Sequence, residues 1–325
     1  MGLRTFSSEA LAGFLDDMES QHILFYLPAK WEEKSLSVRL DAGELVRPMP
    51  GMYARASYWA SLNRREKMLH VVHTLSIQHP TWVFSHSAAA LAHGLEVPYA
   101  LYWPIHYVTE RSGGGKAQRL MCHHRAERCE SEMVNGIRVT PVDQTVVDCA
   151  RTYAFRHALA QADSALRLGL TTKPGLIARL DQCQNRRNVR RAQGLLVAAD
   201  PRPENGGESV IRAIMMEQGL PIPELQFPIP NPEDSRHVFR ADFVFDVRGE
   251  YLVDMELDGY DKYDDPTVTR GRTALQVHME ERQREAGITA HGIRVVRFGF
   301  WQAVNVGFLL RRLALYGVVP QEEGE

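Results

Sequence analysis

Apolar and polar residues alternate in the C-terminal third of the chain with the two-residue period of a β-strand. The alternation predicts strands over residues 225–229, 238–245 and 251–257, and an apolar run predicts a further strand over 293–298. Two flanking segments, 207–219 and 273–286, have the spacing or charged composition of helices instead. Together these elements predict a mixed β-sheet flanked by helices.

The first 59 residues show helical periodicity followed by a hairpin pattern. Leu11 and Leu15 fall on one face of a helix that Ser8 can cap, and a second helix is predicted over 31–40. Residues 44–55 predict strand, turn and strand. Helices followed by a hairpin are typical of a winged helix-turn-helix, whose second helix enters the DNA major groove, or of a small αβ cap packed on a larger domain.

The middle of the chain alternates predicted strands and helices. Strands are predicted over 82–84, 105–109, 119–121 and 137–140, and helices over 85–93, 144–168 and 174–199. A Pro- and Gly-rich segment, 200–207, reads as a linker, and a softer break lies near 55–63. We therefore predict a multi-domain α/β protein with domains at 1–59, 60–200 and 207–325.

Composition excludes several classes of protein. Hydrophobic residues make up 44% and charged residues 24% of the 325, which indicates a folded chain. No apolar run approaches the roughly 20 residues that span a bilayer, and the N-terminus lacks a secretion-signal pattern. The four cysteines are too few for a disulfide scaffold. We therefore expect a cytoplasmic protein with no membrane partner.

Charge is distributed unevenly along the sequence. Residues 71–200 carry 15 basic and 10 acidic side chains, a net charge of +5, whereas residues 201–325 carry 14 and 21, a net charge of −7. A chain that simply coats nucleic acid would be basic throughout. The acidic third indicates either a solvated surface or carboxylates that converge on a metal ion.

One cluster of sulfur and nitrogen donors, Cys122-His123-His124 with Cys129, suggests zinc. Its spacing matches no common pair of zinc-ligand motifs. A hairpin with exposed histidines is therefore the favoured interpretation of this segment.

The acidic residues of the predicted sheet form a more specific pattern. Asp254, Glu256 and Asp258 share one face of their strand, and hairpin pairing would bring Asp242 beside Glu256. Like charges placed opposite one another repel, so such a pair favours a bound cation. Oxygen ligands without Cys or His favour Mg²⁺ or Mn²⁺, and an ordinary polar sheet face is the alternative.

A series of short motifs follows in order along residues 1–200: Leu45-Val-Arg, Gly51-Met-Tyr53, the run from Phe84 to Gly94, Gly136-Ile-Arg-Val-Thr-Pro, Thr145 to Ala150 and Ala162 to Arg167. In their order and spacing these motifs resemble the AbiEi-type abortive-infection antitoxin family of bacterial transcriptional regulators. The resemblance implies an N-terminal winged helix that binds promoter DNA, a middle antitoxin domain and a cognate toxin as partner. Candidate DNA contacts are Lys34, Ser35 and Arg39 on the predicted recognition helix and Arg47 on the hairpin.

Three further motifs lie within residues 207–312: Arg240-Ala-Asp-Phe, Glu256-Leu-Asp-Gly-Tyr-Asp-Lys-Tyr263 and Arg294-Val-Val-Arg297. Taken together, they resemble the very-short-patch-repair-like branch of the PD-(D/E)XK nuclease superfamily. The resemblance implies catalytic roles for Glu208, Asp242 and Glu256. At the position where the commonest form of the motif has lysine this chain has Asp258, and the nearest lysine is Lys262.

The residues so identified suggest a metal-dependent cleavage of DNA. Asp242 and Glu256 would bind Mg²⁺ or Mn²⁺ with Asp258 as a third carboxylate, and Lys262 would act near the scissile phosphate. Arg294 and Arg297 would contact DNA phosphates.

Two functions are consistent with these patterns. The first is a DNA endonuclease of phage defence or repair; the second is an antitoxin or transcriptional repressor whose nuclease fold is inactive. Retention of Asp242, Glu256 and Lys262 favours the enzyme, whereas Asp258 and the acidic composition favour the repressor.

Overall fold

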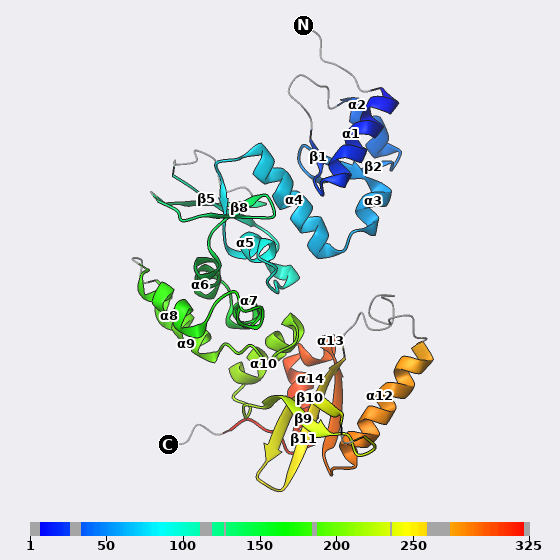
Figure 1. The fold of residues 1–325 in the computed structure, drawn as a ribbon, viewed down its shortest axis with the longest axis vertical. Helices are drawn as coiled ribbons and strands as arrows, with labels where there is room; N and C mark the ends of the chain where they lie inside the picture. Colours follow the sequence, from blue (N-terminus) through cyan, green and yellow to red (C-terminus); the bar gives the residue numbers. More distant parts are fainter. Residues whose placement is uncertain are drawn as a thin grey trace. The chain divides into compact units, whose positions relative to one another are not determined.

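The computed structural model describes residues 7–26, 34–110, 119–126, 128–183, 187–234, 236–258 and 274–321. The chain is a mixed α/β protein, as the sequence predicts, and the strands of the described ranges form three β-sheets (Figure 1). It divides into two compact units, Met1–Asp148 and Cys149–Glu325. Within the described ranges no helix is both long and apolar enough to cross a membrane.

The beginning of unit 1 is a small helical part with its own three-stranded sheet of order β1-β3-β2. Its elements are α1 (Ser8–Ser20), β1 (Phe25–Tyr26), α2 (Lys34–Asp41), β2 (Leu45–Met49) and β3 (Met52–Arg55). Ser7 caps α1 by accepting a hydrogen bond from the Ala10 amide. Leu11, Leu36 and Tyr53 are buried in one core, which joins both helices to the hairpin.

The rest of unit 1 surrounds a five-stranded sheet of order β6-β5-β4-β8-β7. Its elements are α3 (Ala56–Ser61), α4 (Arg64–Gln78), β4 (Val83–Phe84), α5 (His86–Ala92), a 3-10 turn (Tyr99–Leu101), β5 (Ile105–Thr109), β6 (Met121–Arg125), β7 (Glu132–Val134) and β8 (Ile137–Val139). Helix α4 begins with a capping box between Asn63 and Glu66. Helix α6 (Val142–Thr152) continues across the boundary between the two units.

The pairing of β5 with β6 corrects one prediction. These strands run parallel, with His106 opposite Cys122 and Val108 opposite His124, so the segment is not a hairpin. A parallel pair cannot be closed by a tight turn, because the chain must cross back to the other end of the sheet. The histidines of β6 are half-buried rather than exposed.

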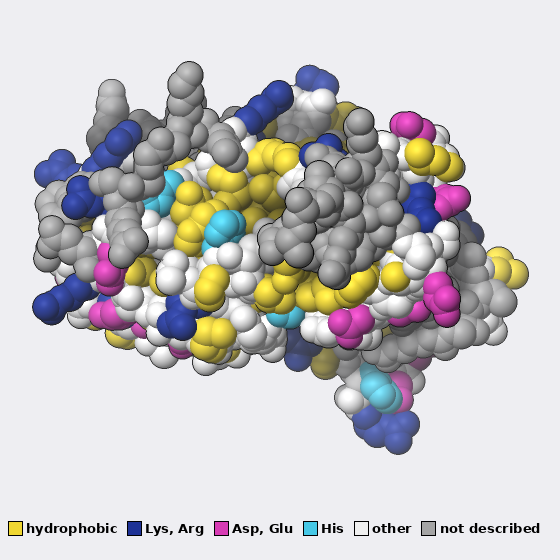
Figure 2. All heavy atoms as spheres, turned by 90° about the horizontal axis from the view of Figure 1, so that it is seen from above, with side chains coloured by type: hydrophobic (Ala, Val, Ile, Leu, Met, Phe, Trp, Pro, Cys, Tyr) yellow, Lys and Arg dark blue, Asp and Glu magenta, His cyan; other side chains and the backbone are white. Residues whose placement is uncertain are grey.

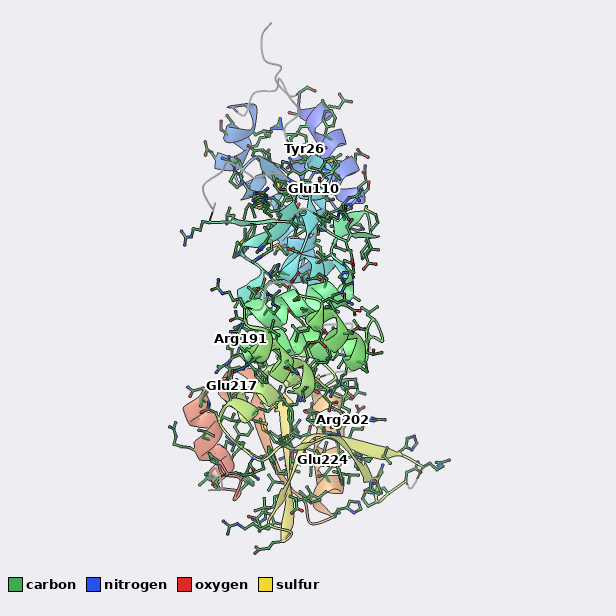
Figure 3. All side chains as sticks on the ribbon, turned by 90° about the vertical axis from the view of Figure 1, so that its left-hand side faces the viewer. Tyr26, Glu110, Arg191, Arg202, Glu217 and Glu224 are labelled. Atoms are coloured by element: carbon green, nitrogen blue, oxygen red, sulfur yellow. The ribbon has the colours of Figure 1, made fainter. Side chains whose placement is uncertain are left out.

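Unit 2 begins with helices that precede its sheet in the chain. They are α7 (Phe155–Arg167), α8 (Lys173–Asp181), α9 (Val189–Ala198) and α10 (Gly206–Glu217), and residues of α10 belong to the core of the sheet. In the segment before α10, Arg202 forms ion pairs with Asp200 at 2.8 Å and with Glu224 at 3.4 Å (Figure 3). The segment that the sequence marks as a linker is therefore attached to the first strand of the sheet.

The sheet of unit 2 is mixed, with strand order β12-β11-β10-β9. Its elements are β9 (Glu224–Pro230), β10 (Val238–Val247), β11 (Tyr251–Asp258), α12 (Ala274–Thr289), β12 (Arg294–Gly299), α13 (Phe300–Ala303) and α14 (Val306–Ala314). Strands β9, β10 and β11 form an antiparallel meander, and β12 pairs parallel with β11. All four predicted strands and both predicted flanking helices are present.

Two apolar cores lie on opposite faces of this sheet. Phe243, Met255 and Phe298 pack in the larger core with residues of α10 and α14. Val244 packs with Ile288 of α12 in the smaller core. On β11 the odd-numbered Val253 and Met255 belong to the larger core, so the even-numbered acidic residues face the side of α12.

Candidate functional site

Four carboxyl groups of unit 2 form an interacting cluster. Glu208 comes from the first turn of α10, Asp242 from β10, and Asp254 and Glu256 from β11. The antiparallel pair Phe243–Met255 sets Asp242 and Glu256 at adjoining positions of neighbouring strands. The charges of Glu208 and Asp242 interact, as do those of Asp254, Glu256 and Asp242, so the structure places Asp254 in the same neighbourhood as three predicted acids. Among the described residues, these carboxyl groups are not one of the sets whose donor atoms lie close enough together to share an ion.

Glu208 is held by a local motif at the start of α10. Asn205 accepts a hydrogen bond from the Glu208 amide at 3.0 Å, and its own amide nitrogen donates to the Glu208 carboxylate at 2.6 Å. Gln226 of β9 donates to the other carboxylate oxygen at 3.1 Å. Burial, together with the nearby charge of Asp242, raises the pKa of Glu208 to about 7. This carboxyl therefore changes its charge near neutral pH.

Asp254 is the most deeply buried acid of the cluster. Its side chain is fully inaccessible, and neither oxygen accepts a hydrogen bond from a described residue. Burial, followed by the charge of Glu256, raises the pKa of Asp254 far above the usual range. A buried carboxyl beside a second carboxyl needs either a proton or a cation.

Asp242 and Glu256 have different partners. The Asp242 carboxylate accepts a hydrogen bond from the backbone amide of Leu257 at 2.9 Å. Arg284 of α12 holds both oxygens of Glu256, at 2.7 and 2.8 Å, and also donates to the carbonyl of Arg240. Burial lowers the pKa of Arg284, but the hydrogen bond and charge of Glu256 outweigh that effect and raise it.

Asp258 lies at the end of β11 within a separate ion-pair network. Arg297, its neighbour on β12, donates to both of its carboxylate oxygens, at 2.8 and 3.3 Å. Arg297 also lies 3.7 Å from Glu281 and 3.5 Å from Glu285 of α12. The predicted third carboxylate ligand and the predicted phosphate contact therefore bind each other.

Arg294, another predicted residue, does not join the cluster. Arg294 starts β12 opposite Val253, and its guanidinium lies 3.5 Å from the centre of the Tyr251 ring. Lys262, the predicted catalytic lysine, lies outside the described residues.

The donor set of the cluster fits a hard divalent cation. All of its donors are carboxylate oxygens, which Mg²⁺ and Mn²⁺ prefer over nitrogen and sulfur ligands. Within the described part of the chain, Arg284 is the arginine that forms an ion pair with the cluster, through Glu256. Ionisation of Glu208 and Asp254 would add negative charge to this neighbourhood.

Sequence reasoning missed three residues of this site for different reasons. Asp254 shares the strand face of Glu256, so the alternation contained the signal but did not distinguish it from a solvated acid. Arg284 stands among several charged residues of one helix, and Gln226 lies in an ordinary strand. No local pattern marks either of them.

The predicted DNA contacts of unit 1 are only partly described. Lys34 and Ser35 lie in α2, but their side chains are outside the described part of the structure. Arg39 donates to the Ser8 hydroxyl at 2.9 Å. Arg47 is exposed on β2, with its guanidinium 5.9 Å from the centre of the Tyr53 ring.

Charged side chains on the face drawn in Figure 2 are dispersed. Lys and Arg occur among Asp and Glu there, and the described side chains form no continuous basic stripe on that face.

Comparison with known proteins gives two partial relatives. No family model matches the chain. The uncharacterized proteins MT2308 and Rv2248, from two strains of Mycobacterium tuberculosis, are each 34% identical over 126 residues, or 39% of this chain. The match spans 45% of either relative, so the chain aligns with less than half of their length.

Proposed function

We propose that this protein binds DNA and that unit 2 hydrolyses DNA phosphodiester bonds with Mg²⁺ or Mn²⁺, in phage defence or repair. The observation that carries the proposal is the cluster of Glu208, Asp242, Asp254 and Glu256, four carboxyl groups with one ion-paired arginine. The resemblance of residues 207–312 to the PD-(D/E)XK nucleases supports it. So does the order of elements in unit 2, a helix, three antiparallel strands, a helix and a parallel strand.

The charge of the cluster is the physical reason for a cation. Glu208 and Asp254 keep protons at pH values where exposed carboxyls have lost them, because burial and neighbouring acids oppose ionisation. A divalent cation would remove that opposition and favour the ionised form of each acid. Binding of the ion and release of protons are then coupled.

Three acids of the cluster and Arg284 would take part in the reaction. Asp242 and Glu256 would hold the ion, which when bound supplies an activated water and neutralises charge on the phosphate. Glu208 would accept or return a proton close to pH 7. Arg284 would orient Glu256, and the exchange of Arg284 for the ion at one carboxylate oxygen is the step that loading requires.

A second candidate function is an antitoxin or transcriptional repressor with an inactive nuclease fold, which would have a toxin as its partner. The observation that favours it is the double hydrogen bond between Arg284 and Glu256, because an arginine can substitute permanently for a metal ion. The ion pair between Asp258 and Arg297 adds to this argument.

The test is incubation of the purified chain with supercoiled plasmid and Mg²⁺ or Mn²⁺, with EDTA as the metal-free control. We expect nicking that requires the ion and that falls at least about 100-fold in Asp242→Asn and Glu256→Gln. Asp246→Asn is a matched control for Asp242→Asn, because Asp246 is an exposed acid of β10, the strand that also carries Asp242. We expect it to cut at the parent rate.

A variant of Lys262 distinguishes the effect of this residue on the cleavage rate from an effect on metal binding. Lys262→Ala should lower the cleavage rate while Mg²⁺ affinity, measured by calorimetry, is unchanged, since a cation near the phosphate acts on the transition state. Glu256→Gln should lose both. A parent protein that binds promoter DNA but neither cuts plasmid nor binds Mg²⁺ would instead establish the repressor.

A further inference from the structure

Three histidines of unit 1 converge from separate elements. His86 is the first residue of α5, His106 lies on β5 and His124 lies on β6. Nitrogen atoms of all three rings lie within 4.8 Å of one another. This group lies outside the carboxylate cluster and belongs wholly to unit 1.

The parallel pairing of β5 and β6 positions two of these rings. Nδ1 of His106 and Nε2 of His124 are 2.8 Å apart, a hydrogen-bond distance at which one nitrogen carries the proton and the other accepts it. Two ring nitrogens this close, with a nitrogen of a third ring within 4.8 Å, could become ligands of one metal ion. The ion would take the place of the shared proton.

His86 is held in a costly backbone conformation, and its ring lies against both of the other rings. Its φ is +53°, in the left-handed region that residues other than glycine seldom adopt. Its ring stacks on His106 and on His124, with both centroid separations at 4.5 Å. Strained residues of this kind persist where the surrounding structure fixes them, and they are frequent at ligand sites.

The rings lie largely out of contact with water. His86 and His106 are buried and His124 is half-buried. Among the described contacts are the Ser85 hydroxyl, 3.0 Å from Nδ1 of His86, and the Cys122 sulfur, 3.6 Å from Nε2 of His124.

We propose that His86, His106 and His124 bind one divalent transition-metal ion of the zinc class. Three imidazole ligands suit Zn²⁺ or Co²⁺ and are poor ligands for Mg²⁺, so this site and the carboxylate cluster select different ions. Tetrahedral Zn–N bonds of about 2.1 Å set ligand nitrogens about 3.4 Å apart, so the His106–His124 pair must open by about 0.6 Å. A water molecule or the Cys122 thiolate completes the coordination.

Such an ion would connect the start of α5 to two strands of the sheet. Ligands that bind only the folded state raise its stability by mass action, so unit 1 should melt at a higher temperature with the ion than without it. His123, the residue between Cys122 and His124, points elsewhere and contacts the Thr109 hydroxyl at 2.7 Å. It serves as a matched control on the same strand.

The experiment uses the full chain, freed of metal with chelator, and one equivalent of Co²⁺ or Zn²⁺. We expect stoichiometric binding by elemental analysis after desalting, a visible Co²⁺ spectrum of tetrahedral intensity, and no displacement by millimolar Mg²⁺. His124→Gln, which alters the least buried ligand, should weaken binding at least about 100-fold, and His123→Gln should leave it unchanged.

Several outcomes would overturn the site. They are substoichiometric retention of Zn²⁺ by the folded parent protein, an octahedral Co²⁺ spectrum, and equal retention by parent and His124→Gln. If His106→Gln fails to fold, the half-buried His124 variant still decides the matter, with circular dichroism as the check on its fold. If the Co²⁺ complex of the parent protein has a sulfur-to-metal charge-transfer band and Cys122→Ser lacks that band, then sulfur is the fourth ligand.

Discussion

Asp163→Ala should destabilise unit 2 strongly, because it removes one partner of a buried ion pair. Arg212 of α10 donates to both carboxylate oxygens of Asp163 on α7, at 2.8 and 2.7 Å, and to the carbonyl of Ala198 at 2.9 Å. The Asp163 carboxylate also accepts the Asp200 amide at 2.8 Å. One carboxylate therefore joins two helices and the segment before α10.

The magnitude follows from the burial of both partners. Asp163 is fully buried and Arg212 is 4% exposed, so the variant leaves a guanidinium without its counter-ion in a site that water does not reach. Breaking such a pair costs about 3–5 kcal/mol. Burial raises the pKa of Asp163 and Arg212 lowers it, and the effect of burial is the larger one. The attraction within the pair therefore does little more for folding stability than offset the cost of removing its charges from water.

The assay is differential scanning calorimetry of the full chain. A cost of about 3–5 kcal/mol lowers the melting temperature of a unit of this size by about 6–20 °C. Arg156→Ala is the control, since Arg156 and Glu217 pair between the same two helices at 2.5 Å but remain partly exposed. Its cost should be at most about 1 kcal/mol.

A second variant tests the reasoning itself. Asp163→Leu combined with Arg212→Met removes both charges and keeps most of the volume, so it should be far less harmful than Asp163→Ala alone. For a unit of this size, each kcal/mol changes the melting temperature by about 2–4 °C. A melting temperature lowered by less than about 2 °C in Asp163→Ala would refute this account of the ion pair. A double variant as unstable as Asp163→Ala would refute it too.

Three further predictions concern pH, backbone and DNA. Because the pKa of Glu208 is raised to about 7, the contribution of this carboxyl to folding stability is greatest below about pH 4 and is lost as pH rises towards 7. The affinity for Mg²⁺ should increase over the same range. The Mg²⁺ affinities measured by calorimetric titration at about pH 6 and about pH 8 should therefore differ, and Glu208→Gln should reduce that difference. Gly317→Ala should cost about 1–3 kcal/mol in thermal unfolding, because φ is +82° and the new Cβ would lie 2.5 Å from the Tyr251 hydroxyl, whereas Gly249→Ala meets no atom within 4 Å and should cost less. Arg47→Ala should reduce the salt slope of DNA binding by about 0.9 if its guanidinium contacts a phosphate, and an unchanged slope would exclude that contact.

Local patterns in the sequence determined most of the secondary structure and one face of the candidate site. Side chains alternate strictly along a strand, so the period of residues 251–257 was enough to place Asp254 and Glu256 on the same side of the sheet. The cap at Asn205 likewise fixes Glu208 in the first turn of its helix through contacts three residues apart. These features depend on residues a few positions apart in the chain, so the sequence alone is enough to predict them.

Only the tertiary structure decided which distant groups meet. The pairing of Arg284 with Glu256 joins residues 28 positions apart, and no residue pattern selects that arginine from the other charges of its helix. His86, His106 and His124 meet because β5 and β6 run parallel, a choice that depends on how the chain crosses the sheet. Their spacing resembles no ligand motif, since nonlocal packing rather than sequence separation sets the distances between their rings.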